Sequence, residues 1–213
     1  GQPLHAFDRD LLTGNKIIVR RAKKGEPFAS LDGSALKLEP DALVIADGEK
    51  PVALAGIMGG TNSQVSDSTR HIVLESACFD PATVRQSSKK YGLRSDSSYR
   101  FERGVDWEGV VSAQARAILL IKELAGGEIC SGRVDIYPEK GKPVSVSLRL
   151  SRLNQLLGAS FKAKQVQDLL SRLGMEIASP SEDMEVKIPS FRPDLLREVD
   201  LIEEIARIDG FDK

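Results

Sequence analysis

Hydrophobic residues in the first half of the chain stand in short runs that turn residues separate. The runs rich in β-branched and aliphatic residues are 17–19, 43–46, 51–55 and 71–75. Runs of this length, bounded by glycine, proline, serine or aspartate, are typical of β-strands. Asp47 and Gly48 lie between the second run and the third and predict a hairpin. We therefore expect a strand-rich first half.

Two helices are predicted in the segment that follows. Asp80 is a suitable N-cap, Pro81 suits the first helical position, and Gly92 ends the first helix. Residues 107–125 form a longer amphipathic pattern that ends at a glycine pair. Its apolar stripe consists of Val110, Ala113, Ala117, Leu120, Ile121 and Leu124. The stretch 93–104, LRSDSSYRFERG, is therefore expected to be a structured loop between two helices.

The chain changes in character at residues 138–143, where PEKGKP has the composition of a linker. Beyond it, the pattern predicts in order one strand at 144–148, two short helices ended by Gly158 and Gly174, a hairpin around Pro180 and a last helix before Gly210. This succession is typical of small α+β modules of the winged-helix type. We predict an α+β chain with a mixed, strand-rich domain at 1–137 and a small winged-helix-like domain at 144–213.

Composition narrows the class of protein. The chain has 213 residues, of which 41% are hydrophobic and 29% charged, as in ordinary globular proteins. No apolar run approaches the ~20 residues that span a membrane, and no secretion signal opens the chain. Two cysteines and two histidines argue against a disulfide scaffold and a Cys/His zinc cluster. We expect a cytoplasmic protein, and GQPLHAFD at its start suggests a piece of a longer chain.

The net charge of −1 hides a basic segment. Residues 84–104 contain six basic and two acidic side chains, which gives a local charge of +4. A patch of this kind can bind nucleic acid although the whole chain is not basic. A solvated charged face is the alternative, and charge alone favours that alternative.

Two ionisable residues stand in apolar surroundings. Glu75 ends an apolar run, where a carboxylate is costly unless it finds a hydrogen-bond donor; a strand-end residue that faces water is the alternative. His5 lies among Leu4, Ala6 and Phe7, so it is either a core histidine bonded to a carbonyl or a ligand contact. The sequence has no Walker lysine after GIMGG and no GxSxG elbow, so neither phosphate-loop nor serine-hydrolase chemistry is supported.

Four acidic residues gather around the start of the last predicted helix: Asp194, Asp200, Glu203 and Glu204. The spacing i, i+3 and i+4 puts the last three on one helix face. Either Arg197 and Arg207 neutralise these carboxylates or a hard divalent cation such as Mg²⁺ does. Spacing alone favours an arginine-paired, solvated face.

Five motifs, taken together and in this order, resemble the β chain of bacterial phenylalanyl-tRNA synthetases. They are GQPLHAFD, VALAGIMGG, IVLESACFDP, GLRSDSSYRFERGVD and PSFRPDLLREVDLIEEIARIDGF. The resemblance implies that residues 1–137 belong to the family's tRNA-editing domain and 144–213 to the small domain after it. A fold like that of DNA-binding winged domains does not imply DNA binding, and ten basic against twelve acidic residues in 144–213 make DNA an unexpected ligand.

The resemblance also implies an activity, the hydrolysis of tyrosine wrongly attached to tRNA(Phe). An apolar pocket rejects an added hydroxyl only modestly, by ~10²-fold, whereas a second site that requires the hydroxyl can discriminate further. In this family's pattern Glu75 reads the phenolic hydroxyl and His5 places the terminal adenosine or a water. The residues expected to line the pocket are Gly59, Gly60, Ser95 and Ser97.

Partners and a cofactor follow from the same resemblance. The family's ATP-dependent synthetic site lies on a partner α chain, so we expect a tetramer of two α and two β subunits that binds tRNA(Phe). Arg94, Arg100 and Arg103 are expected to contact the tRNA. Asp194, Asp200, Glu203 and Glu204 match the positions of a Mg²⁺ in the family, which would be structural or would support the interface with the α chain. A non-catalytic scaffold that docks tRNA is the alternative function.

Overall fold

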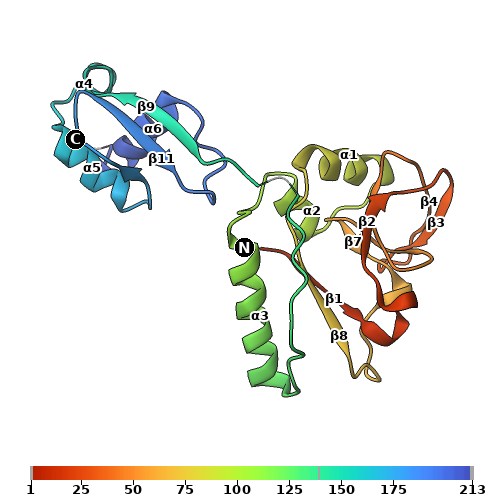
Figure 1. Cartoon of the computed structure of the whole chain (residues 1–213). Helices are drawn as coiled ribbons and strands as arrows, with labels where there is room; N and C mark the ends of the chain where they lie inside the picture. Colours follow the sequence, from red (N-terminus) through yellow and green to blue (C-terminus); the bar gives the residue numbers. More distant parts are fainter. Residues whose placement is uncertain (1, 139, 212–213) are drawn as a thin grey trace. The chain divides into compact units, whose positions relative to one another are not determined.

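The computed structural model describes residues 2–138 and 140–211, and the chain divides into two compact units, Gly1–Gly132 and Arg133–Lys213 (Figure 1). Each unit has its own hydrophobic core. Strands and helices occur in both units, so the predicted α+β class is confirmed. The predicted domain limits, with a linker at 138–143, stay predictions.

Unit 1 builds antiparallel pairs from short strands within its described residues. β1 (Leu4–Asp8) pairs with β8 (Ile72–Ser76), and β3 (Glu26–Ala29) pairs with β4 (Ala35–Leu38). A further sheet has the strand order β2 (Ile18–Arg21), β5 (Leu43–Ala46), β6 (Pro51–Leu54) and β7 (Met58–Gly59). The antiparallel neighbours β5 and β6 confirm the predicted hairpin.

The two predicted helices of unit 1 are α1 (Pro81–Tyr91) and α3 (Gly109–Ala125). The Asp80 side chain accepts a hydrogen bond from the Thr83 amide at 2.7 Å and caps α1. Gly92 ends α1 in the left-handed region, as a C-terminal glycine should. The predicted apolar stripe of α3 stays outside the core, because no residue of this helix is fully buried. Short 3₁₀ turns occur at Arg9–Leu11, Thr13–Asn15 and Thr61–Ser63.

A third helix, α2 (Asp96–Phe101), occupies part of the stretch 93–104, for which the sequence predicts a loop. Its cap is a reciprocal pair of hydrogen bonds: the Ser98 amide donates to the Ser95 hydroxyl at 3.0 Å, and the Ser95 amide donates to the Ser98 hydroxyl at 2.9 Å. Glutamate or glutamine normally takes the second position of such a capping box. Because serine takes it here, the usual sequence signal for a helix start is weak.

The core of unit 1 lies between its sheets and the helices α1 and α2. The largest fully buried side chains there include Phe7, Leu38, Ile45 and Leu54. Gly56, in the left-handed region at φ 70°, lets the backbone pass close to this core. A Cβ at Gly56 would lie 2.9 Å from Phe79 and 3.2 Å from Phe101, whose rings form an edge-to-face pair. The glycine therefore fixes where the GIMGG loop runs.

Unit 2 has the order of elements that the sequence predicts. These are β9 (Val144–Arg149), α4 (Leu150–Leu157), α5 (Ala163–Ser171), β10 (Glu176–Ile177), β11 (Asp183–Ile188) and α6 (Glu198–Asp209). The strands form one antiparallel sheet in the order β10-β11-β9. Leu148, Leu153, Leu170, Leu201 and Ile205 are fully buried between this sheet and the helices.

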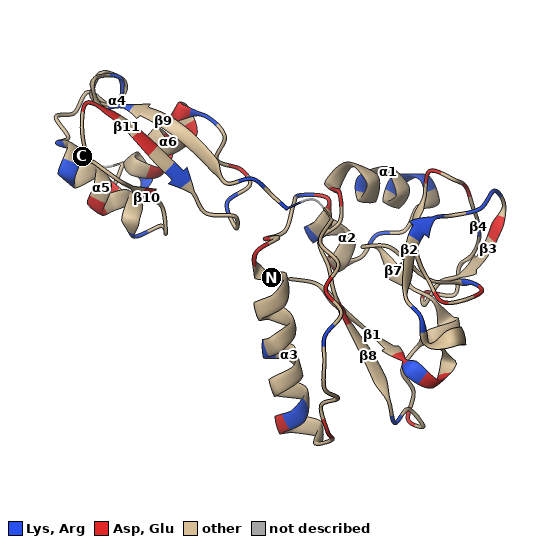
Figure 2. Ribbon diagram, viewed as in Figure 1, with Lys and Arg blue, Asp and Glu red and all other residues tan. Residues whose placement is uncertain are grey.

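Charged residues are spread over both units, and Figure 2 shows basic positions repeated along α1. Among the described residues, no helix combines the length and the apolar character that crossing a membrane requires. Cys78 and Cys130 are both exposed and free.

Candidate functional site

The ladder between β1 and β8 brings His5 and Glu75 together. The two residues are direct partners in the antiparallel register, so their side chains point to the same face. Phe7 and Val73 are the next pair on that face, and Phe7 is completely buried in the core. The face that carries His5 and Glu75 therefore points inward, and two residues that are distant in sequence become neighbours.

Glu75 is half-buried in an apolar environment. Burial raises the pKa of its carboxyl group to about 7, because the charged form loses its hydration. Within the described part of the chain, its side chain has neither a hydrogen bond nor an ion pair. The structure lies between the two alternatives that the sequence leaves open: the side chain keeps some contact with water but is largely desolvated. An unpaired, desolvated carboxylate is free to accept a hydrogen bond from a ligand.

His5 is wedged between Phe7 and Gly59. Its ring makes an edge contact with the Phe7 ring at a centroid distance of 4.5 Å. A Cβ at Gly59 would lie 2.8 Å from Nε2, so only glycine leaves space for the imidazole. Nε2 is buried and finds no hydrogen-bond partner among the described residues. Burial lowers the pKa of His5, so the ring is neutral at physiological pH.

Gly60 follows Gly59 at the end of the GIMGG loop. Its amide donates a hydrogen bond to the Val52 carbonyl at 2.8 Å. A Cβ at Gly60 would lie 2.9 Å from that carbonyl oxygen and 3.1 Å from the Phe28 ring. Both glycines thus permit close packing of backbone, but only Gly59 contacts a candidate site side chain.

Ser95 and Ser97 reach the GIMGG loop from the first turn of α2. The Ser95 hydroxyl donates to the Ile57 carbonyl at 2.6 Å, and the Ser97 hydroxyl donates to the Gly56 carbonyl at 3.0 Å. The structure therefore brings both serines to the loop that holds Gly59, as a lining role requires. Their hydroxyl protons are used to fasten α2 to this loop.

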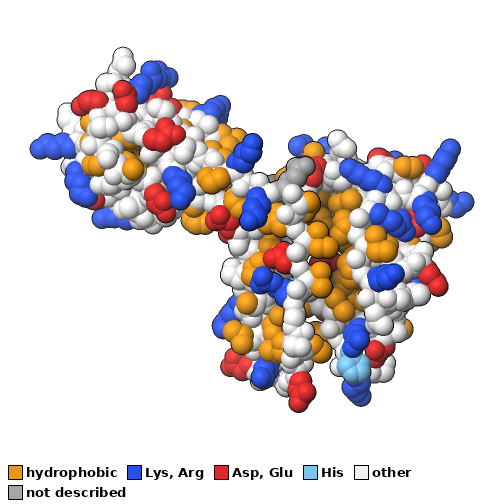
Figure 3. All heavy atoms as spheres, viewed as in Figure 1, with side chains coloured by type: hydrophobic (Ala, Val, Ile, Leu, Met, Phe, Trp, Pro, Cys, Tyr) orange, Lys and Arg blue, Asp and Glu red, His pale blue; other side chains and the backbone are white. Residues whose placement is uncertain are grey.

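Hydrophobic side chains gather in a hollow on the face of unit 1 that presents β1 and β8 (Figure 3). This ladder carries the His5–Glu75 pair on one side, while its other side contacts α3. The Gln114 side chain of α3 donates to the Leu74 carbonyl at 2.9 Å, and the Ser76 hydroxyl donates to the Val110 carbonyl at 2.9 Å. The helix α3 thus packs against the face of the ladder opposite to His5 and Glu75 and stabilises β8, the strand that carries Glu75.

A separate cavity of about 890 Å³ lies between α1 and α2. It is lined by Arg85, Ser88, Lys89, Arg94, Ser95, Asp96, Ser98, Tyr99, Glu102 and Arg103. Of the three arginines predicted to contact tRNA, Arg94 and Arg103 line this cavity, whereas Arg100 does not. The sequence placed Arg85 and Lys89 in the basic segment 84–104 but did not predict them as tRNA contacts. The signal that could have found them is their i, i+4 spacing on a predicted helix.

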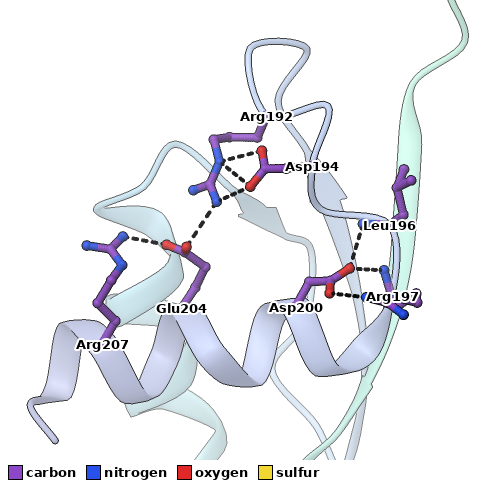
Figure 4. A network of polar contacts seen from close by, with 7 residues as sticks. All are labelled: Arg192, Asp194, Leu196, Arg197, Asp200, Glu204 and Arg207. Carbon is purple, nitrogen blue, oxygen red and sulfur yellow. Dashed lines mark hydrogen bonds and ion pairs between the residues drawn. The ribbon is translucent and has the colours of Figure 1, made fainter. Parts of the chain in front are cut away.

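The acidic residues of α6 and the segment before it are paired with arginines (Figure 4). Arg192 donates to Asp194 at 2.7 Å and to Glu204 at 3.0 Å, and Glu204 also accepts from Arg207 at 2.5 Å. These hydrogen bonds lower the pKa of Asp194 and of Glu204, with Arg192 as the main cause for both. This arginine holds together two carboxylates that would otherwise repel each other.

Asp200 has a different task, at the start of α6. One of its oxygens accepts from the Arg197 amide at 2.8 Å and from the Leu196 amide at 3.1 Å. The Arg197 guanidinium donates to its other oxygen at 3.1 Å and, as the main cause, lowers the pKa of Asp200. Glu203, the fourth acidic residue of the predicted metal site, is exposed.

These acidic residues, as placed, do not fit a magnesium ion. The described residues contain no group of three or more histidine, cysteine, aspartate or glutamate side chains that could hold a metal ion. Mg²⁺ needs carboxylate oxygens that are free to coordinate it, and those of Asp194, Asp200 and Glu204 already accept from arginines. The arginine-paired alternative from the sequence therefore describes this arrangement, with Arg192 as the member that the sequence did not suggest.

Two domain families account for nearly the whole chain. Residues 1–126 match the B3/4 domain, and residues 146–211 match the tRNA synthetase B5 domain. The class of protein is therefore a tRNA synthetase subunit with a B3/4 domain followed by a B5 domain. More narrowly, the chain belongs to the family of phenylalanine–tRNA ligase β subunits, so the resemblance in the five motifs is confirmed.

Curated relatives carry that family name. The chain is 48% identical over 213 residues to the phenylalanine–tRNA ligase β subunit of Moorella thermoacetica and 49% identical over 216 residues to that of Syntrophus aciditrophicus. Both alignments cover all of this chain but only 26% and 27% of the relatives. The chain thus spans about a quarter of the length of these relatives.

A solved structure shares the fold. It is an N-terminal fragment of the phenylalanyl-tRNA synthetase β subunit from Pyrococcus horikoshii, with a TM-score of 0.52 and 17% sequence identity. The match covers 97% of this chain and 59% of the solved one. At this identity the likeness is one of fold alone.

Proposed function

We propose that this chain is the editing part of a phenylalanine–tRNA ligase β subunit and that it hydrolyses Tyr-tRNA(Phe). In this reaction water cleaves the ester and releases tyrosine and free tRNA. The observation that carries the proposal is the inward-facing His5–Glu75 pair, whose carboxylate is desolvated and has no partner in the described residues.

The desolvated carboxylate provides the selectivity that editing needs. A tyrosyl hydroxyl that enters the site donates a hydrogen bond to Glu75 and offsets part of the cost of its burial. A phenylalanyl ring offers no donor, so it would leave the carboxylate buried and unsatisfied, which costs about 1–3 kcal/mol or more for a charged group. Correctly charged Phe-tRNA is thereby spared.

His5 has a positioning role in this proposal. Burial keeps its imidazole neutral, and Gly59 and Phe7 hold the ring in one orientation. A fixed, neutral ring can orient the terminal adenosine or the attacking water, and orientation alone can supply a large part of ester hydrolysis. Gly59, Gly60, Ser95 and Ser97 form the wall behind it.

The proposed partners follow from family membership. The relatives are named β subunits, so we propose an α subunit that carries out aminoacylation, a tetramer of two α and two β subunits, and tRNA(Phe) as the substrate, in the cytoplasm. Magnesium has no step in this proposal. A magnesium ion at Asp194, Asp200, Glu203 and Glu204 would first have to displace the arginines that now pair with Asp194, Asp200 and Glu204.

The test is deacylation of Tyr-tRNA(Phe) by the complete β subunit paired with its α subunit. Glu75→Ala should abolish tyrosine release while aminoacylation with phenylalanine continues. Glu49→Ala is the matched control, because Glu49 is an exposed glutamate of the same unit. Unchanged tyrosine release by Glu75→Ala would remove the assigned role of this residue.

A non-catalytic scaffold that docks tRNA is the second candidate. This candidate is favoured by the other polar groups near the pair, which already have contacts within the protein. The Ser95 and Ser97 hydroxyls donate to backbone carbonyls, and His5 Nε2 faces Gly59. The two candidates differ in one measurement on the complete enzyme. A scaffold predicts that Glu75→Ala leaves both tRNA binding and deacylation unchanged, whereas editing predicts loss of deacylation with binding retained.

A further inference from the structure

We propose that the cavity between α1 and α2 binds phosphate groups of an RNA chain through Arg85, Lys89 and Arg94. Neither His5 nor Glu75 lines this cavity, so it is a second site of unit 1, with Ser95 as a residue that it shares with the predicted editing pocket. The inference rests on the proposed function in one respect: the RNA is taken to be the tRNA whose ester the His5–Glu75 site cleaves.

The three cationic side chains are free to bind an anion. Within the described ranges, Arg85, Lys89 and Arg94 are exposed and take part in no hydrogen bond or ion pair. Lys90, the next residue on α1, behaves differently, because its ammonium group pairs with Asp41 at 2.7 Å. Of the cations on α1, the unpaired Arg85 and Lys89 line the cavity, whereas the paired Lys90 does not.

The fold places these three positive charges close together, where they repel one another. Arg85 and Lys89 stand at i and i+4 on α1, where like charges face each other and destabilise a helix. Gly92, with φ 67°, then reverses the chain and returns Arg94 to the same cavity. A bound anion would offset this repulsion, and none of the three side chains is paired with an acidic group that does so.

Apart from Asp96, whose exposed carboxylate opposes an anion, the serines and Glu102 of the cavity already have partners within the protein. The hydroxyl of the buried Ser88 donates a hydrogen bond to the Leu93 carbonyl at 2.6 Å. Ser95 and Ser98 bond to each other in the cap of α2. Glu102 accepts from Arg103 at 2.5 Å, which neutralises its charge locally. With four basic and two acidic residues around it, the cavity keeps a net charge of +2.

An aromatic side chain beside the cations points to RNA rather than to a free anion. Tyr99 is 56% exposed and lines the cavity, and the Arg103 guanidinium lies 3.6 Å from its ring centroid. Such a stacked pair offers a flat surface for a nucleobase. Cations that track the backbone next to surfaces that stack bases are the usual means of binding single-stranded RNA.

The experiment measures binding of deacylated tRNA(Phe) transcript to the complete enzyme over a series of salt concentrations. The double variant Arg85→Gln/Lys89→Gln should reduce the slope of log K against log salt by about 2, because each cation that binds a phosphate adds about one to the slope. Lys24→Gln/Lys37→Gln is the matched control, since these exposed lysines of unit 1 do not line the cavity, and its slope should equal that of the wild type. Arg85→Lys keeps the charge and should keep the slope.

Competition identifies the source of the anion. Poly(U) should displace the transcript, whereas inorganic phosphate and polyglutamate at the same charge concentration should not. Equal slopes for the double variant and the wild type would overturn the proposal. So would displacement by phosphate, which means a small-anion site, or by polyglutamate, which means an acidic protein partner.

The readout is independent of editing. The transcript carries no ester, and Glu75→Ala should bind it with the wild-type slope. If Glu75→Ala still released tyrosine, the proposed function would fail while the phosphate site stood. If the double variant kept its slope while Glu75→Ala lost deacylation, the reverse would hold.

Discussion

At the scale of single residues, Glu75 lies in an ordinary apolar strand, and yet the pKa of its carboxyl group is strongly raised. On the face of the ladder that carries Glu75, the next pair is Val73 and the fully buried Phe7, so the surroundings of its side chain on that side are apolar. Desolvation alone then raises the pKa of the carboxyl group to about 7. A group with that pKa changes its charge near neutral pH, and this has consequences for activity and for stability.

We predict that tyrosine release depends on pH through Glu75. The ionised carboxylate is the strong acceptor for the phenolic hydroxyl, and it becomes protonated as the pH falls through about 7. The rate of Tyr-tRNA(Phe) deacylation, corrected for spontaneous hydrolysis, should therefore fall between about pH 8 and pH 6. A Glu75→Gln enzyme should be slow at every pH. A flat profile for the wild type would contradict the assignment.

The same shift predicts a gain in stability for Glu75→Gln. The pKa of Glu75 is raised in the folded state, which means that folding favours the protonated side chain. The stability that this preference provides is fully present below the unfolded pKa of 4.5 and is lost as the pH rises through about 7. At pH 8 the variant should have a higher free energy of unfolding by up to about 3 kcal/mol, and near pH 4 the two should agree. Urea unfolding followed by the fluorescence of Trp107, the single tryptophan, measures this within unit 1.

Gly59 gives a second prediction at this scale. A methyl group there collides with the His5 ring, so Gly59→Ala should lower the free energy of unfolding by about 1–3 kcal/mol. In a His5→Ala background much of that collision is gone, and the same substitution should cost clearly less. A double-mutant cycle by urea unfolding gives the coupling. Equal costs in both backgrounds would mean that the ring does not rest against Gly59.

At the scale of elements, the short helix α2 depends on its cap. Ser95 accepts from the Ser98 amide and donates to the Ile57 carbonyl, so one side chain both starts the helix and fastens it to the GIMGG loop. Ser95→Ala should lower the free energy of unfolding by about 1–2 kcal/mol. Ser112→Ala is the matched control, because that exposed serine bonds only within its own helix, and it should change stability by less than about 0.5 kcal/mol.

The helix α6 gives a prediction about metal. Because Arg192, Arg197 and Arg207 already neutralise Asp194, Asp200 and Glu204, we expect the stability of unit 2 not to depend on magnesium. Calorimetric unfolding of the chain in EDTA and in Mg²⁺ should give the same midpoint for unit 2. Arg192→Met, which removes the central cation, should lower that midpoint. A midpoint that rises with Mg²⁺ would restore the metal site that the family pattern implies.

At the scale of the whole molecule, each unit has a core of its own, and this predicts two unfolding transitions. Leu201→Ala removes a fully buried side chain of unit 2 and should cost about 2–5 kcal/mol there. The transition that Trp107 reports belongs to unit 1 and should stay in place. Leu54→Ala, in the core of unit 1, should do the opposite. A shift of both transitions by either variant would show that the units unfold together.

Much of the architecture can be predicted from local patterns. The start of α1 depends on Asp80 and Pro81, which are adjacent in sequence, and the β5–β6 hairpin depends on two neighbouring apolar runs. The helix α2 could not be predicted with the same ease, since its capping box uses serine in place of glutamate. Candidate site residues were found through long motifs, whereas Arg85 and Lys89 belong to no such motif and carry only a charge pattern.

The sequence by itself determined the helices α1 and α3, the strands β2, β5, β6 and β8 and the order of elements in unit 2, because helix and strand periodicity and capping act over a few neighbouring positions. Its long motifs also determined the family. The strands β1, β3 and β4 and the helix α2 were not predicted. Only the tertiary structure decided that His5 faces Glu75 and that Arg192 joins Asp194 to Glu204. It also decided that Arg85, Lys89 and Arg94 share one cavity. Strand register and side-chain pairing depend on which distant segments pack together, and local spacing does not specify that packing.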